Sequence, residues 1–593
     1  MTHLAFPAPT DTRAEPAAAR AVATVDAWVA RPRSWHWRLN PLWRAVERLR
    51  LSWAKHPSLL GHPRIALRLS RWLPEYHYAE HEAFGVDGAP ATVVARRRAA
   101  FNRLAQLSRE RSPKTLAASG AIAARVSDAA FVNAHRVPFQ FRRLVEAHLP
   151  VGSFVDETDG PRVRDLDGNW SWDLGGSYGV NLFGHEFYKR CLESAAAEAA
   201  AFGTILGPYH PVVQENVDRL CAISGMDEVS FHMSGTEAVM QAMRLARYHT
   251  GRSHIVRFVG AYHGWSDGVQ AGPGNPRPVG EVYTLPEMRE RTLAVLRARD
   301  DIAAVLVNPI QAMHPNSGPP TDATLVTGQR PTGADLDAYR AWLRDLRAVC
   351  DERRIVLIFD EVFLGFRLGL GGAQEYFGVR ADLVTYGKTL GGGLPIGVLC
   401  GKAPLMRRFK DGKAADLCFA RGTFNAHPQV MAAMAAFLRR LEDDDIRDTY
   451  RGLEERWTSR VARLNGRLEA AGVPVRVSHL VSVWMTRFTQ PGRYHWLLQY
   501  YLRAHGLTMG WIGTGRFILS HDLSETDCDA IFDRFVAAAV EMQQDGWFWR
   551  DPDVPDHAVV RSIKQRVLRE TRQALFRASP RASSDRSAHP AGA

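Results

Sequence analysis

The chain has 593 residues, of which 46% are hydrophobic and 23% charged, and its formal net charge at pH 7 is +12. This length predicts two or three domains, and the composition is that of a soluble globular protein. No apolar run approaches the length of a bilayer span, so we expect no transmembrane segment, and the N-terminus has no basic region followed by an apolar stretch that would indicate a signal peptide.

Cysteine usage and charge narrow the expected environment. The six cysteines are scattered without any Cys-x-x-Cys pair, which argues against a zinc site and a disulfide framework and favours the reducing cytoplasm. The positive charge could attract nucleic acid or an acidic partner. An arginine-rich composition spread over a large surface explains the charge more simply, and we expect no nucleic-acid partner.

The first 130 residues differ from the rest of the chain. Residues 1–20 are rich in Ala, Pro and Thr and predict a disordered leader. Residues 21–130 predict a helical extension, with one helix starting at Asn40-Pro41 and a second short amphipathic pattern at Ile65, Leu69 and Trp72. Apolar residues of the first helix follow at helical spacing at Leu42, Val46, Leu49 and Trp53. The tryptophans of this region are Trp28, Trp35, Trp37, Trp43, Trp53 and Trp72.

Residues 31–72 carry ten Lys/Arg and one acid, Glu47. The simplest interpretation is an extension packed on the catalytic part through its tryptophans. Two alternatives stay open. The basic surface could dock an acidic partner, such as a carrier protein bearing the substrate, or an amphipathic helix could lie on a membrane surface.

From about residue 150 the pattern becomes α/β. Residues 163–170 predict a hairpin. Apolar segments at 229–232, 255–258, 302–307 and 355–359 alternate with helices at 211–223, 238–250 and 339–352, which predicts a mainly parallel sheet covered on both faces. Residues 446–545 predict a smaller α+β unit, and a helix is expected at 559–576.

These patterns give an expected domain order. It consists of a disordered leader (1–20), a helical extension (21–130), the first part of a small domain (131–184), a cofactor-binding large domain (185–445), the second part of the small domain (446–550), and a C-terminal helix with a disordered tail (551–593).

The most informative residue is Lys388, which precedes a glycine-rich run and lies 28 residues after Asp360 at the end of a buried strand. A lysine and an aspartate in this arrangement suit pyridoxal 5'-phosphate (PLP): the lysine can form a Schiff base with the aldehyde, and the aspartate can pair with the pyridinium nitrogen. Taken singly, Asp360 could be a helix N-cap and Lys388 a solvated surface lysine.

Four further motifs fit the same cofactor. Ser234-Gly235-Thr236 begins a helix whose N–H groups and hydroxyls can bind phosphate, although Ser234 and Glu237 also form a plain capping box. Tyr262, before His263, could stack on a flat ring or simply pack in the core. The Gln311 amide could bond a ring oxygen or lie in a turn, and Thr423 could give a further phosphate contact.

In this order the motifs resemble the class III (fold-type I) PLP-dependent aminotransferases, and most closely their glutamate-1-semialdehyde aminomutase branch. The resemblance spans about residues 130–545. The motifs that carry it are 234–240 (SGTEAVM), 244–247 (RLAR), 250–252 (TGR), 262–264 (YHG), 360–362 (DEV), 365–367 (GFR) and 387–397 (GKTLGGGLPIG). It implies a fold-type I α/β architecture with a mainly parallel central sheet and a smaller α+β domain.

The resemblance also implies roles for single residues. Lys388 holds PLP covalently, and Asp360 pairs with its ring nitrogen. Val362 packs on one face of the ring and Tyr262 on the other, and His263, which follows Tyr262, also belongs to the cofactor site. Ser234, Gly235 and Thr236 hold the phosphate, Gln311 approaches the ring hydroxyl, and Thr423 reaches the phosphate of the neighbouring subunit, which implies an obligate homodimer. Arg136 falls near the aminomutases' carboxylate-binding arginine, and Tyr178 lies in the substrate-side segment.

Several departures bear on the substrate. The family usually has Glu-Pro where this chain has Asn308-Pro309, and Thr where this chain has Leu364. The segment 313–333 is longer than the corresponding segment of the family. The first 130 residues have no counterpart in the simple aminomutase. We therefore predict an aminotransferase that uses a small-molecule amino donor and a carbonyl acceptor, which could be carrier-bound or belong to specialised metabolism. Two alternatives stay open: glutamate-1-semialdehyde 2,1-aminomutase, and a non-catalytic binding protein on this scaffold.

Overall fold

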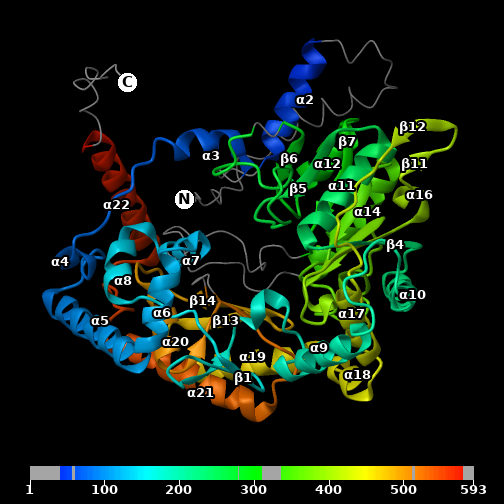
Figure 1. Ribbon diagram of the computed structural model, residues 1–593. Coiled ribbons are helices and arrows are strands. Elements are labelled where there is room, and N and C mark those ends of the chain that lie inside the picture. Colours follow the sequence, from blue (N-terminus) through cyan, green and yellow to red (C-terminus); the bar gives the residue numbers. More distant parts are fainter. Residues whose placement is uncertain (1–40, 56–60, 278–279, 310–335, 511–514, 578–593) are drawn as a thin grey trace, which may run out of the picture.

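The structure is a computed structural model that describes residues 41–55, 61–277, 280–309, 336–510 and 515–577. A large α/β part and a smaller part, built from segments near both ends of the chain, lie side by side (Figure 1). The predicted leader, the tail after residue 577 and Gln311 lie outside the described residues, as do Trp28, Trp35 and Trp37.

The large part is built on a seven-stranded sheet. Its strands are β4 (Glu228–His232), β5 (His254–Phe258), β6 (Val282–Leu285), β7 (Ile302–Val307), β8 (Val356–Asp360), β9 (Leu383–Gly387) and β10 (Gly397–Gly401). Their order is β4-β10-β9-β8-β7-β5-β6. β10 is antiparallel to both its neighbours and the other pairs are parallel, which confirms the predicted mainly parallel sheet.

Both faces of this sheet are buried, as its apolar strands require. Alternate side chains face α11 (Gly235–Thr250), among them Ile358 on β8, and pack with that helix in one apolar cluster. Their neighbours, such as Leu357 and Phe359, belong to the larger core on the opposite face. The other elements of this part are α9 (His185–Ala199), α10 (Val212–Ser224), α12 (Glu290–Ala298), α14 (Leu336–Arg353), α15 (Gly372–Phe377), α16 (Ala403–Met406), β11 (Phe409–Lys410), β12 (Lys413–Leu417), α17 (Pro428–Arg440) and α18 (Asp444–Tyr450).

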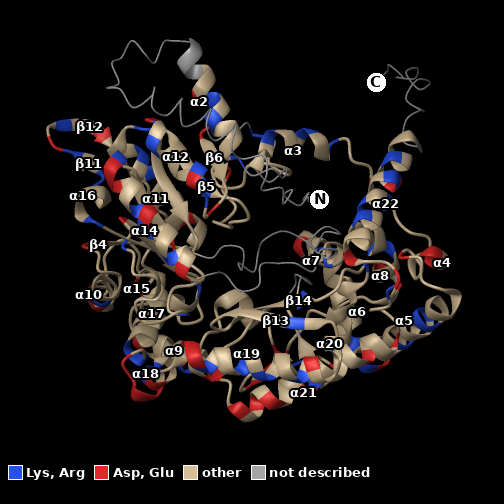
Figure 2. Cartoon of the chain, turned by 180° about the vertical axis from the view of Figure 1, so that it is seen from behind, with Lys and Arg blue, Asp and Glu red and all other residues tan. Residues whose placement is uncertain are grey.

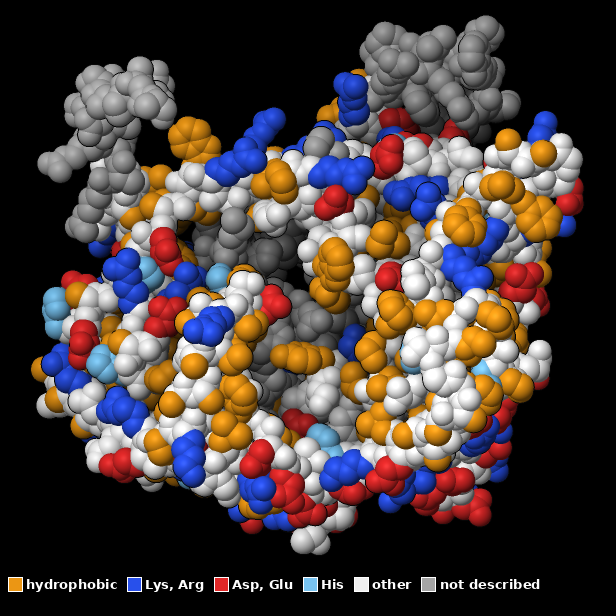
Figure 3. All heavy atoms as spheres, viewed as in Figure 1, with side chains coloured by type: hydrophobic (Ala, Val, Ile, Leu, Met, Phe, Trp, Pro, Cys, Tyr) orange, Lys and Arg blue, Asp and Glu red, His pale blue; other side chains and the backbone are white. Residues whose placement is uncertain are grey.

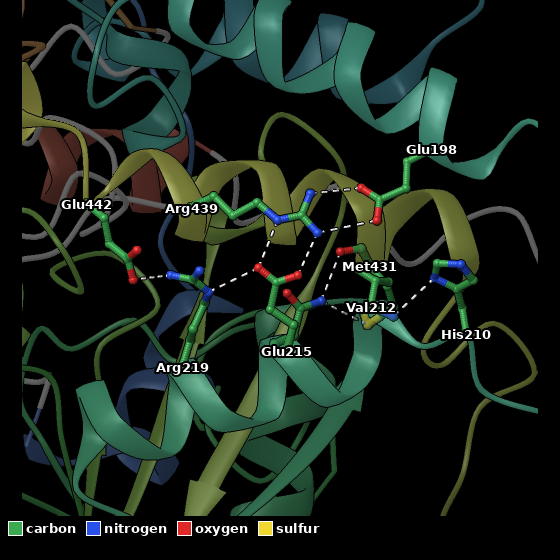
Figure 4. Close-up of polar contacts among 9 residues, drawn as sticks. Glu198, His210, Val212, Glu215, Arg219, Met431, Arg439 and Glu442 are labelled. Carbon is green, nitrogen blue, oxygen red and sulfur yellow. Dashed lines mark hydrogen bonds and ion pairs between the residues drawn. The ribbon is translucent and has the colours of Figure 1, made fainter.

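An ion-pair network fastens three of these helices together. Arg439 of α17 donates to Glu198 of α9 (3.0 Å) and to Glu215 of α10 (2.5 Å), and Arg219 bonds both Glu215 and Glu442 (Figure 4). All five groups keep part of their surface in solvent, so the network contributes less than a buried one would.

The smaller part contains two sheets. One is antiparallel and consists of β13 (Val475–Leu480), β14 (Val483–Phe488) and β16 (Arg516–Ile518). The other consists of β1 (Glu157–Asp159), β2 (Arg162–Arg164), β3 (Trp170–Asp173) and β15 (Leu507–Thr508). β2 and β3 form the predicted hairpin, and β15 pairs with β3 in parallel. Its helices are α19 (Leu453–Ala470), α20 (Leu498–Ala504) and α21 (Glu525–Gln544).

The N-terminal extension is helical, as predicted. Its helices are α2 (Pro41–Ala54), α3 (Pro63–Ser70), α4 (Glu80–Ala83), α5 (Ala91–Arg111), α6 (Pro113–Ala123) and α7 (Ser127–Ala134). Helix α8 (Arg142–His148) follows in the segment predicted to begin the small domain, and the last helix of the described residues is α22 (Asp556–Arg577). The buried Arg97 of α5 bonds both oxygens of Asp87 and the carbonyl of Gly546, and lies 4.5 Å from the Tyr494 ring centroid. Helix α5 of the extension therefore packs on the C-terminal part of the chain.

The expected role of the tryptophans was partly wrong. Trp53 of α2 packs under the Arg291 guanidinium at 3.8 Å, but Trp72 is 75% exposed and Leu49 is 69% exposed. α2 meets the large part near its end, where Ala54 is buried, and the buried Glu47 pairs with Arg50. Packing therefore uses only part of the apolar stripe that the sequence shows.

The surface mixes charges of both signs. α19 carries both blue and red segments, α5 is mainly blue and α21 mainly red, whereas α3 shows blue only (Figure 2). Within the described residues, no helix is both long and apolar enough to cross a membrane.

Candidate active site

Lys388 and Asp360 meet at the carboxyl edge of the central sheet. Asp360 is the last residue of β8 and is only 2% exposed, and Lys388 directly follows the adjacent parallel strand β9. This edge is where open α/β sheets bind ligands. Lys388 has φ +47°, a left-handed conformation that is unusual outside glycine; such strain is concentrated at functional sites.

Three donors orient the Asp360 carboxylate. His263 Nδ1 lies 2.7 Å from Oδ2, and the Thr385 hydroxyl and the Val362 N–H each lie 3.2 Å from Oδ1. Burial lowers the pKa of His263, although the Asp360 carboxylate opposes this shift. The imidazole is therefore neutral near pH 7, and we assign its proton to Nδ1, which donates to Asp360.

The Lys388 ammonium is destabilised where it lies. Burial lowers the pKa of Lys388 to about 8, against the opposing attraction of Asp360 and with a smaller contribution from the Arg367 guanidinium. Its Nζ is 5.7 Å from the Phe363 ring centroid. A substantial share of Lys388 is therefore neutral at physiological pH, which a nucleophile or a base requires.

Close glycine contacts bring the predicted phosphate loop to this edge. A Cβ on Gly235 would lie 2.7 Å from Val362 Cγ1, and one on Gly387 would lie 3.2 Å from the same atom. A Cβ on Gly264 would lie 2.3 Å from the Thr236 hydroxyl. The cradle thus has no room for side chains at these positions, and the residues present fit a phosphorylated flat cofactor at a helix N-terminus.

The alternative capping interpretation of the same segment is half right, because the Glu237 carboxylate bonds the Met233 N–H and not the N–H of Ser234. Ser234 is the N-cap of α11, and its side chain accepts from the Glu237 N–H at 3.3 Å, while Glu237 accepts from the Met233 N–H at 2.9 Å. The cap fixes the helix start and leaves Gly235 facing Val362.

The predicted substrate-side residues Arg136 and Tyr178 also lie near Lys388. A Cβ on Gly179 would be 3.4 Å from Lys388 Cδ, so the preceding Tyr178 is close to the lysine. Tyr178 has φ +57°; burial raises its pKa, and the positive charge of Arg136 opposes that shift. Arg136 is therefore within electrostatic reach of the site.

Thr423, a predicted phosphate contact, does not reach the site of its own chain. Thr423 is exposed in the loop before α17, and no described contact joins it to Lys388, Asp360 or the start of α11. Gln311 lies outside the described residues.

Sequence reasoning missed several residues around the site. Thr385 is a polar residue inside the apolar strand β9, and its pairing with Asp360 across β8 and β9 could have indicated its role. Tyr188 shares a hydrogen bond with the Thr389 hydroxyl, next to Lys388. Arg503 and Tyr500 carried no signal, because the residue that they approach, Arg136, is more than 360 positions away in sequence.

Comparisons with known proteins identify the family of the chain. The family described as "Aminotransferase class-III" matches residues 145–539. Glutamate-1-semialdehyde 2,1-aminomutase of Nitratidesulfovibrio vulgaris (strain DP4) is 36% identical over 351 residues, which cover 58% of this chain and 80% of that protein.

Solved structures with the same fold include transaminases and an aminomutase. A transaminase with PLP bound is 27% identical with a TM-score of 0.57, over 71% of this chain and 99% of that one. A glutamate-1-semialdehyde-aminomutase from Pseudomonas aeruginosa PAO1 is 20% identical with a TM-score of 0.61, over 76% and 99%, and this likeness shows the fold alone. The predicted fold type is thereby confirmed.

Proposed function

Because the chain belongs to the class-III aminotransferase family, and is thus a PLP-dependent aminotransferase or aminomutase, we propose that it transfers an amino group between two molecules, an amino donor and an aldehyde or ketone acceptor. The position of Asn308 carries this choice. Asn308 follows β7, whose Val307 pairs with Phe359, so this buried amide lies beside Asp360. A neutral residue stands there, where the resembling family usually has glutamate.

A second altered position supports the same choice. Leu364 is buried four residues after Asp360, where the family usually has threonine. Both changes replace polar or charged groups near the cofactor edge with less polar ones, while Lys388 and Asp360 are kept. We therefore expect the cofactor chemistry to be retained and the aminomutase substrate to be replaced by another.

The residues of the site would divide the work of holding PLP. Asp360 would pair with the ring nitrogen, and His263 would keep this carboxylate oriented through its Nδ1–H. Tyr262 and Val362 would flank the ring. Ser234, Gly235 and Thr236 would receive the phosphate at the start of α11, with Gln311 toward the ring hydroxyl. When bound, PLP supplies an electron sink for negative charge at the substrate carbon.

Lys388 would act first as the anchor and then as the proton carrier. Once free, its Nζ would take the proton from the substrate carbon that bears the nitrogen and would return it later in the exchange. A pKa of about 8 suits this exchange, because both protonation states are populated near neutral pH.

A second copy of the chain would complete the site. Thr423 lies near the exposed aromatic residues Phe419 and Phe424, and Tyr209 is exposed as well. Hydrophobic side chains gather over the region of α10, α17 and the β11–β12 hairpin (Figure 3). Exposed apolar surface of this kind favours an interface, and a homodimer would place the partner's copy of this loop at the phosphate. Light scattering of the purified protein would give the mass of a dimer.

The location and the acceptor are further parts of the proposal. The six cysteines all lie in described segments and are unpaired there, which suits the cytoplasm. A carrier-bound acceptor would explain the basic extension, since α3 and the following turn expose arginines next to apolar side chains. These residues are Arg64, Ile65, Arg68, Leu69, Arg71 and Trp72. Reversing the three arginine charges to glutamate should then raise KM for carrier-bound but not for free acceptor.

The decisive experiment uses the full-length protein with PLP added. Primary amines are screened for loss of the visible absorbance of lysine-bound cofactor, and the amine-loaded protein is then given carbonyl acceptors. Lys388→Ala should lack this absorbance, and the exposed-lysine control Lys413→Ala should keep it. Conversion of glutamate-1-semialdehyde at an ordinary enzymatic rate with no added donor would establish the aminomutase instead. A wild-type protein that never gains the absorbance would support the non-catalytic alternative.

A further inference from the structure

Two arginines near the site have no carboxylate partner among the described residues. Arg136 is 3% exposed, and burial lowers its pKa. Arg503 of α20 is partly buried; burial and the neighbouring Arg136 charge lower its pKa to about 9. Each guanidinium is still cationic at neutral pH, and two such charges close together are unfavourable without a counter-anion.

The two guanidiniums converge on one stretch of backbone. Arg503 Nη2 donates to the Met509 carbonyl at 2.8 Å, and Arg136 Nη1 donates to the next carbonyl, that of Gly510, at 3.4 Å. Gln499 of α20 donates to the Arg136 carbonyl at 3.2 Å, which ties this helix to residue 136. The relative position of the two side chains is thus fixed by backbone contacts.

Within the described residues, three polar atoms of this cluster have no hydrogen-bond partner. They are Arg136 Nε, Arg503 Nε and the hydroxyl of Tyr500, which is 6% exposed. Buried donors are nearly always satisfied in folded proteins, and leaving them unpaired is costly. Three unpaired donors beside two cations indicate a site built for an anion.

This cluster lies on the substrate side of Lys388. The Arg136 charge acts on Tyr178, and the next residue, Gly179, is the one whose Cβ would lie 3.4 Å from Lys388 Cδ. A ligand held by the arginines could therefore extend past Tyr178 toward the lysine.

We propose that Arg136, Arg503 and Tyr500 form a pocket for an end group with two negative charges, a phosphate monoester or a dicarboxylate, on the substrate whose amine or carbonyl reaches Lys388. One carboxylate would leave a guanidinium uncompensated, whereas two charges neutralise both. Planar guanidinium forks bind carboxylate and phosphate oxygens in pairs. This inference rests on the proposed function, since it names the substrate class of the same site.

The first test measures anion binding without turnover. The cofactor-loaded full-length protein, whose phosphate cradle is filled, is titrated calorimetrically with inorganic phosphate, malonate and acetate. We expect phosphate or malonate to bind at least about tenfold more tightly than singly charged acetate, and the better of the two identifies the end group. Equal binding of all three anions would overturn the proposal.

The second test uses variants. Arg503→Leu should weaken binding of the preferred dianion about 10- to 100-fold, and Arg503→Lys, which keeps the charge but loses the fork, should retain part of the preference over acetate. The matched control is Arg247→Leu, because Arg247 is also desolvated and donates to one backbone carbonyl, that of Ser253 at 2.8 Å, on the large part. Unchanged dianion binding in both Arg503 variants would refute the pocket.

Amine substrates connect the pocket with the reaction. If the end group is a dicarboxylate, γ-carboxyglutamate should load the cofactor with a lower KM than glutamate, whose far end carries a single charge. If it is a phosphate, O-phosphoethanolamine should do so relative to ethanolamine. Arg503→Leu should abolish the difference through KM. If both members of each pair react with equal KM, the pocket fails while the proposed function stands. Loss of visible absorbance in wild type would instead remove the proposed function.

Discussion

The depressed pKa of Lys388 predicts unusual reactivity in the cofactor-free protein. With a pKa of about 8, roughly a quarter of Lys388 is neutral at pH 7.5, against about 0.1% of a lysine at the usual 10.5. The ratio is on the order of 200. Burial outweighs the attraction of Asp360 here, so the advantage comes from desolvation of the ammonium.

The assay is competitive labelling of the cofactor-free protein with trace acetic anhydride from pH 6 to 11, followed by mass spectrometry of the peptide that contains Lys388. The exposed lysines Lys114 and Lys413 calibrate the reagent in the same digest. Labelling of Lys388 should rise about tenfold per pH unit and level off above pH 8. Asp360→Asn should move the midpoint lower, because it removes the opposing carboxylate.

The same shift has a consequence for stability. The unfolded chain holds the lysine proton more tightly than the folded one, so the stability of the cofactor-free protein should rise with pH between about 8 and 10.5 and stay flat below that window. The full effect is on the order of 3 kcal/mol. A labelling midpoint near 10 would refute the reasoning, since it would mean that Lys388 is solvated or paired in solution.

Three further predictions follow from the geometry of the site and of the helices. His263→Leu removes the donor to Asp360 Oδ2, and we expect the amine half-reaction to slow about 10- to 100-fold while the visible absorbance of bound cofactor remains, measured by stopped-flow absorbance. Gly264→Ala should raise the Kd for PLP more than tenfold, because the new Cβ would meet the Thr236 hydroxyl of the cradle; titration of the cofactor-free protein with PLP measures it. The control is Gly274→Ala, which should bind PLP normally. Gly274 has nearly the same φ, +86° against +85°, but a Cβ there would have no neighbour within 4 Å. Arg439→Ala should lower the free energy of unfolding, measured by urea denaturation, by about 1 kcal/mol, an effect that 1 M salt should reduce.

The sequence predicted the central sheet and its catalytic edge because local patterns determine them. The apolar run that ends at Asp360 reads as a buried strand. Strand β9 was not among the predicted strands, and its parallel pairing with β8 is what brings Asp360 and Lys388 together. The antiparallel strand β10 was not anticipated. It starts within a glycine-rich run, where a Cβ on Gly397 would lie 1.9 Å from the Ser234 carbonyl, a constraint that only the fold reveals.

Contacts between distant segments could not be predicted in this way. The pocket at Arg136 and Arg503 depends on Gln499 and on two consecutive carbonyls after β15. No local period marks such a meeting. Likewise, nothing in the spacing of aromatic residues distinguishes Trp53, which packs under Arg291, from the exposed Trp72.

The N-terminal extension itself has two structurally different segments. From Tyr76 onward it is bound to the C-terminal part: Tyr78 donates to Glu570 of α22 at 2.8 Å, and Arg97 holds Asp87 and the carbonyl of Gly546. Arg136 follows directly on this packed segment, so the extension positions a residue of the proposed anion pocket. Deleting residues 1–130 would therefore disturb substrate binding whether or not a carrier docks on the basic surface. Charge reversal on α3, which leaves the segment from Tyr76 intact, separates the two roles: loss of free-substrate binding would then point to the packed segment, and loss of carrier-bound substrate alone to α3.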